Sequence, residues 1–148
     1  MTRRHPLHKE IYAYFESDMN GRAPASIAML ERYSAGAMEG FYRLRRATTV
    51  ESSLSKKVRE LIIVAVEAAL KRDPSGHARI AVAAGASPQE IHDAVALVLW
   101  LAGMPAYHHG MLAVAAAEEH VARSRARRPK RGRARRCRRP ARRTLRNP

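Results

Sequence analysis

One segment restricts the fold of this chain more than any other. Between Val58 and Leu70 the only charged residues are Arg59, Glu60 and Glu67, and the other ten residues are all apolar. A helix that is apolar nearly all round belongs in the interior of a protein, because a surface helix keeps one polar face for water. The sequence therefore predicts a buried helix here.

The composition favours helices around this segment. Apolar residues make up 46% of the chain but aromatic residues only 5%, so Ala, Val, Leu and Ile must form the core, which suits packed helices better than a β-sandwich. The sequence Ser87-Pro-Gln-Glu90 has the pattern of a capping box with proline at the first helical position. We predict an all-α fold with helices over Leu7–Met19, Pro24 to about Arg46 (with a break at Gly36 or Gly40), Lys56 to about Lys71 (capped by Ser53 or Ser55), His77–Ala84, Pro88 to about Ala102 and Pro105 to about Ala122.

Charge divides the chain into two parts. Residues 123–148 contain 14 Lys or Arg and no acidic residue, whereas residues 1–122 contain 14 basic and 13 acidic residues. We therefore predict a nearly neutral helical domain over 1–122 and an Arg-rich, disordered tail over 123–148. Three hypotheses remain open for the tail: an arm that contacts nucleic acid weakly through phosphate charge, an extension without function, or an aid to assembly.

Location follows from what the sequence lacks. It has no run of about 18 apolar residues, and its first residues have no apolar stretch of the signal-peptide kind. The single cysteine, Cys137, excludes an internal disulfide. We expect a cytoplasmic protein with no membrane association.

Glu60, Glu67 and His77 are the candidate catalytic residues. The two glutamates are seven residues apart, so they share one face of the apolar helix, and a buried carboxylate needs a partner or a proton. Two roles are possible for these glutamates: they form structural ion pairs with Arg59, Arg79 or another subunit, or at least one of them is a proton relay. His77 is either a helix-start histidine bonded to a backbone carbonyl or an acid–base group beside a buried Glu.

His108 follows the turn at Pro105, and at most one of the adjacent His108 and His109 can face a shared pocket. No histidine pair on one helix face indicates a metal site, and no phosphate-binding loop or nucleophile motif occurs. We expect neither a metal nor another cofactor.

The stretch from Leu54 to about Ala116 resembles the carboxymuconolactone decarboxylase family, which includes AhpD-type alkylhydroperoxidases. The resemblance is carried by Leu54-Ser-Lys-Lys-Val-Arg-Glu-Leu-Ile62, by His77-Ala-Arg-Ile-Ala-Val-Ala-Ala-Gly-Ala-Ser-Pro-Gln-Glu-Ile91, and by Gly103-Met-Pro105. It implies an all-α domain that assembles into homotrimers or hexamers, with sites at subunit contacts.

The chain departs from the AhpD-like branch. Members of that branch carry a C-x-x-C motif shortly before the histidine, and here the two positions are Leu70 and Asp73. Thiol peroxidase chemistry is therefore not expected. The decarboxylase branch, which lacks the cysteines, implies acid–base chemistry on a small carbonyl or lactone substrate.

In that reading His77 is the acid and base, Glu60 orients it or relays the proton, with Glu67 as the fallback, and Pro105 and His108 contact substrate. The alternatives are a non-catalytic or residual peroxiredoxin-type member without the dithiol, and nucleic-acid association through the tail.

Overall fold

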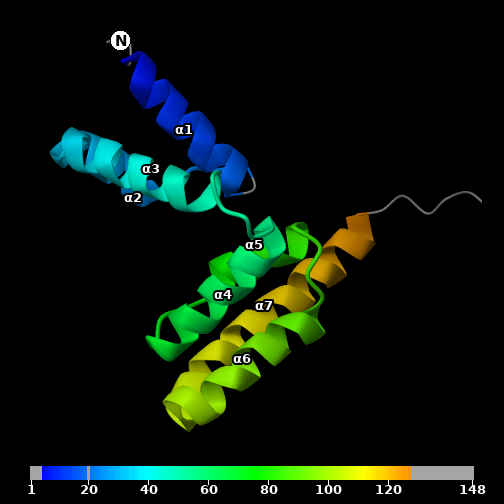
Figure 1. Cartoon of the computed structure of the whole chain (residues 1–148). Coiled ribbons are helices and arrows are strands. Elements are labelled where there is room, and N and C mark those ends of the chain that lie inside the picture. Colours follow the sequence, from blue (N-terminus) through cyan, green and yellow to red (C-terminus); the bar gives the residue numbers. More distant parts are fainter. Residues whose placement is uncertain (1–4, 20, 128–148) are drawn as a thin grey trace, which may run out of the picture.

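A computed structural model describes residues 5–19 and 21–127. Over these residues the chain is all-α, as predicted, with helices joined by short turns (Figure 1). The helices are α1 (Pro6–Asp18), α2 (Ala25–Tyr33), α3 (Ala35–Thr49), α4 (Lys56–Ala69), α5 (Ser75–Ala83), α6 (Pro88–Ala102) and α7 (Met104–Arg127).

The first three helices form one group with its own small core. The buried side chains that meet there are Ile11, Phe15, Ile27, Met38 and Tyr42. The expected break between the second and third helices occurs at Ser34 and not at a glycine. Ser34 has non-helical backbone angles (φ −159°, ψ 73°), and it ends α2 and begins α3. Gly36 and Gly40 both lie within α3, because a glycine costs a helix only about 1 kcal/mol.

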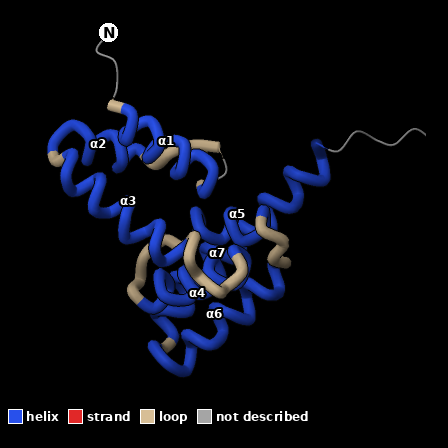
Figure 2. Tube along the Cα trace, turned by 45° about the horizontal axis from the view of Figure 1, so that its top comes forward, coloured by secondary structure: helices blue, strands red, loops and turns tan. Residues whose placement is uncertain are grey.

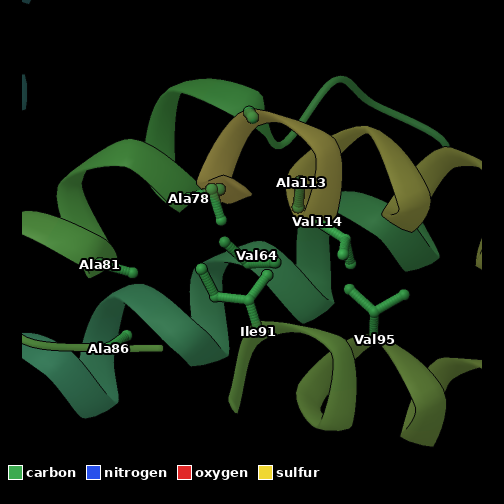
Figure 3. Close-up of a cluster of buried hydrophobic side chains, with 10 residues drawn as sticks. Val64, Ala78, Ala81, Ala86, Ile91, Val95, Ala113 and Val114 are labelled. Atoms are coloured by element: carbon green, nitrogen blue, oxygen red, sulfur yellow. The ribbon is translucent and has the colours of Figure 1, made fainter. Parts of the chain in front are cut away.

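The other four helices form a bundle around a core of small aliphatic side chains. Figure 3 shows Val64 of α4, Ile91 and Val95 of α6, and Ala113 and Val114 of α7 converging. The predicted capping box is confirmed, since the Ser87 and Glu90 side chains each bond the other residue's backbone N–H. Alanine dominates α5 and α7, which lets the helix axes approach closely.

The prediction that the apolar helix is buried all round is wrong for a single chain. Val64 and Ala68 of α4 are fully buried, but Val58, Ile62 and Val66 stand exposed along its opposite side, and Leu70 is exposed just after the helix ends. The three neighbouring helices α5, α6 and α7 cover only part of the surface of α4, so an apolar stripe remains in contact with solvent.

The last helix is longer than predicted. α7 continues through Arg127, beyond the expected domain end at residue 122 and into the segment predicted to be disordered. An ion pair between Arg123 and Glu119, one helical turn apart, supports the extension. The predictions for the rest of the tail, and for Cys137, fall outside the described residues.

Two contacts join the helix groups where α3 leads into α4. Lys56 at the start of α4 donates to the Asp18 carbonyl oxygen at 2.8 Å, and the Arg59 guanidinium donates to the Thr49 carbonyl oxygen. Figures 1 and 2 show α1–α3 as one group and α4–α7 as another, linked by this segment. Within residues 5–19 and 21–127, no helix is long and apolar enough to cross a membrane.

Candidate active site

The site is centred on a hydrogen bond between α4 and α5. His77 Nδ1 lies 2.7 Å from Glu60 Oε2. Glu60 is 1% exposed, and it is the one charged residue with a buried side chain in the described part of the chain. A carboxylate this deep needs a strong donor, and His77 supplies it. Of the alternatives left open by the sequence, the structure has neither an arginine partner for Glu60 nor a backbone partner for His77 among the described residues; it has the histidine beside the buried glutamate.

A tight turn brings His77 back toward α4. The Arg72 N–H donates to the Glu67 carbonyl oxygen and the Lys71 N–H to that of Ala68, while Lys71 takes a left-handed backbone with φ of 55°. This is the pattern of a Schellman turn, with lysine at the position where glycine is usual. Asp73 Oδ1 then accepts from the Ser75 N–H as α5 begins.

Glu67 lies on the other side of the histidine ring. Its Oε1 is 3.9 Å from His77 Nε2, so both glutamates flank one imidazole and share a helix face as predicted. Burial, the largest influence, raises the pKa of the Glu67 carboxyl, although the charges of His77 and Arg72 act in the opposite direction. Glu67 Oε2 is buried and has no hydrogen-bond partner among the described residues.

The ring geometry fixes how a proton can move. A carboxylate only accepts hydrogen bonds, so Nδ1 of His77 carries the proton that is shared with Glu60. Nε2 has no partner within hydrogen-bond distance in residues 5–19 and 21–127, which leaves it able to accept a proton. The imidazolium formed in that way would have a carboxylate on each side.

His77 opens on a pocket of about 370 Å³ between the two helix groups. The pocket is lined by residues of the α1–α2 turn, α5 and α7: Met19, Pro24, Gly76, His77, Arg79, Ile80 and His120. Its basic groups are Arg79 and His120, and its apolar wall is formed by Met19, Pro24 and Ile80. This size and lining suit a small anionic molecule with an apolar part.

The predicted substrate-binding residues lie elsewhere in the single chain. Pro105 and His108 are exposed near the start of α7 and do not line the pocket at His77. His120, Met19 and Pro24 line this pocket but were not among the residues predicted from the sequence. His120 had no local signal, because it contributes only through the way that α7 packs across α5.

No group of three His, Cys, Asp or Glu side chains within the described ranges is arranged to hold a metal ion. Leu70 and Asp73, at the positions where the resemblance implies cysteines in AhpD-like proteins, flank the turn after α4. Neither side chain has a thiol.

Comparisons with known proteins agree with this fold. The crystal structure of a protein from Burkholderia xenovorans LB400, provisionally assigned as a carboxymuconolactone decarboxylase, is similar with a TM-score of 0.74 and 28% sequence identity. The similarity covers 83% of this chain and 97% of that one. A search of curated proteins gives no match. The sequence profile of the carboxymuconolactone decarboxylase family matches residues 35–117, from the start of α3 into α7. This chain belongs to the carboxymuconolactone decarboxylase family.

Proposed function

We propose that the chain is an acid–base enzyme of the decarboxylase type, acting on a small carbonyl or lactone substrate in the pocket beside His77. The observation that carries the proposal is the hydrogen bond from His77 to the buried Glu60. A histidine held in one tautomer by a carboxylate, beside a pocket, is suited to general acid–base catalysis near neutral pH.

Each residue then has a defined part. His77 Nε2 takes a proton from the substrate or delivers one, and Glu60 holds the ring and stabilises the imidazolium. Glu67, whose pKa is raised by burial, accepts or returns a proton at the same edge of the ring. In a decarboxylation the electron pair of the broken carbon–carbon bond is delocalised into the carbonyl and is finally taken up by a proton, which His77 supplies.

Arg79 and His120 give the substrate pocket its charge. Both line the same pocket as His77, and a guanidinium binds a carboxylate through two parallel hydrogen bonds. We infer that the substrate carries a carboxylate beside its carbonyl or lactone group.

The family resemblance and one exposed surface support self-association. Ala68, Val98 and Ala106 pack together, so the ends of α4 and α6 meet the start of α7. Large apolar side chains remain exposed at this end: Leu70, Leu97, Trp100, Leu101 and Met104, with Trp100 at 74% and Leu101 at 68%. Several large exposed apolar side chains at one end of a bundle are typical of an interaction surface. We propose that it forms the contact between copies in a trimer or hexamer, and Trp100→Glu should lower the mass measured by light scattering.

Binding tests the substrate class. Thermal-shift measurements on the full chain with lactones and unsaturated dicarboxylic acids should give stabilisation that the neutral amides of the same acids do not. Arg79→Gln should abolish the shift. An equal thermal shift in Arg79→Gln would show that these acids do not bind in the pocket at His77.

In the competing, purely structural interpretation, the bond between Glu60 and His77 only holds α4 to α5. This interpretation predicts that His77→Gln loses stability and has no other effect. The proposal predicts loss of turnover in a variant that keeps its fold and its mass.

A further inference from the structure

A second pocket lies where α3 leads into α4. It has a volume of about 260 Å³ and shares no residue with the pocket at His77. Its lining comes from the end of α3, the following loop and the first half of α4: Arg45, Thr48, Thr49, Ser52, Leu54, Arg59, Ile62 and Ile63.

The two arginines differ in how their charge is compensated. Arg45 donates from Nη2 to Asp18 Oδ2 at 2.8 Å, and Lys56 also pairs with Asp18. Arg59 donates from Nη1 to the Thr49 carbonyl oxygen, and no carboxylate lies within ion-pair distance of it among residues 5–19 and 21–127. Asp18 therefore serves two cations, Arg45 and Lys56, and the charge of Arg59 has no carboxylate partner among residues 5–19 and 21–127.

The arginines also retain unused hydrogen-bonding capacity. The Nε atoms of both Arg45 and Arg59 are buried without an acceptor in the described part of the chain, and Nη2 of Arg59 has no protein partner there. Unmet donors on a partly buried guanidinium are unusual, because each forfeits the hydrogen bonds it had in water. An anion that contacts Nη2 of Arg59 would supply one of the missing acceptors.

The rest of the lining defines what kind of anion fits. Leu54, Ile62 and Ile63 form an apolar wall. The Thr48 and Thr49 hydroxyls already donate to backbone carbonyl oxygens of α3, so they have no proton left to donate to an anion. The Ser52 hydroxyl accepts from the Leu54 N–H and can still donate its own proton. The volume is below the range of about 300–1,000 Å³ usual for larger ligands.

We propose that this pocket binds a small monocarboxylic acid with a compact apolar body. Its carboxylate contacts the Arg59 guanidinium and the Ser52 hydroxyl, and its body lies against Ile62 and Ile63. The site is separate from the catalytic pocket and does not depend on the function proposed for it.

Benzoate is a suitable probe, and isoleucine methyl groups report where it binds. In methyl NMR spectra of the full chain, saturating benzoate should shift Ile62 and Ile63, which line this pocket. Ile80 lines the pocket at His77, so shifts confined to Ile80 would overturn the proposal. Benzyl alcohol, of similar shape but neutral, should bind about tenfold more weakly or worse, because a charge-assisted hydrogen bond is lost; equal affinity would also overturn it.

Matched variants separate the two pockets. Arg59→Gln should weaken benzoate binding at Ile63 by about tenfold or more, whereas Arg79→Gln should leave it unchanged. Arg59 also anchors the Thr49 carbonyl, so a second variant guards against a loss of folding. Thr48→Trp fills the pocket from an exposed position on α3 and should abolish the shifts with the fold intact. Undiminished binding in either folded variant would refute the proposal.

Discussion

Gly110 has the least room of the described glycines, so replacing it tests the packing of the bundle directly. A Cβ added there would lie 2.2 Å from Val95 Cγ1 and 3.2 Å from the Ala68 Cβ, whereas carbon atoms in contact are usually about 3.5–4.0 Å apart. Val95 is fully buried, and a valine in a helix has one strongly preferred rotamer. The clash therefore has to be relieved by moving α6 away from α7.

Gly110→Ala should lower the free energy of unfolding by about 1–2 kcal/mol. Overpacking costs about 1–3 kcal/mol, and the better helix propensity of alanine returns up to about 1 kcal/mol. In a domain of this size the melting temperature should fall by roughly 3–8 °C, measured by circular dichroism with urea unfolding alongside.

Gly40→Ala is the matched control for this change. Gly40 also lies inside a helix, but nothing is within 4 Å of its added Cβ, so the substitution should stabilise the chain by up to about 1 kcal/mol. Adding Val95→Ala to Gly110→Ala should cost less than the two single changes together, because the smaller side chain makes room. A Gly110→Ala variant as stable as Gly40→Ala would show that Val95 leaves room for a side chain at position 110.

Three further changes test the site and its supports. Burial raises the pKa of Glu67, so the contribution of this carboxyl to stability is greatest below the ordinary carboxyl pKa and falls as pH rises through the folded value. Glu67→Gln should therefore remove that pH dependence from melting curves without loss of stability at neutral pH. Turnover should fall in the same variant. Burial opposes ionisation of Asp18, but hydrogen bonding and the charge of Arg45 prevail and lower its pKa. The contribution of Asp18 to the free energy of unfolding is therefore present above the ordinary carboxyl pKa and is lost as pH falls through the lowered one. Asp18→Asn should cost about 1–3 kcal/mol at neutral pH and little in strong acid, as measured by urea unfolding. Ser87→Ala removes the side-chain cap of α6 and should lower the free energy of unfolding in urea by about 1 kcal/mol. A loss near zero would show that the cap does not stabilise α6.

Local signals in the sequence predicted most of the helices. The capping box at Ser87 and the serine cap at Ser55 are local chemistry, and both are confirmed by hydrogen bonds. The break at Ser34 was not predicted, because the Ser34 side chain makes no capping hydrogen bond there and the break is visible only in the backbone angles. The expectation of a break at Gly36 or Gly40 followed from the weak helix propensity of glycine.

Long-range packing accounts for what the sequence did not predict. The spacing of Glu60 and Glu67 placed them on one face, and the structure brings His77 between them. Nothing local indicates that His120 reaches the same pocket, because α1, α2, α5 and α7 must all be positioned before that pocket exists. The exposed side of α4 likewise depends on how much of a helix its neighbours cover.

The most direct test of the central claim is the rate of CO₂ release from carboxymuconolactone and other small unsaturated lactone acids. The wild-type chain is compared with His77→Gln and Glu60→Gln, each checked for fold and mass. The account predicts turnover by the wild type and a loss of about 10²–10⁴-fold in His77→Gln, with a smaller loss in Glu60→Gln, where His77 keeps its proton-transfer edge. Full turnover in a folded His77→Gln, or none by the wild type across the whole panel, would contradict it.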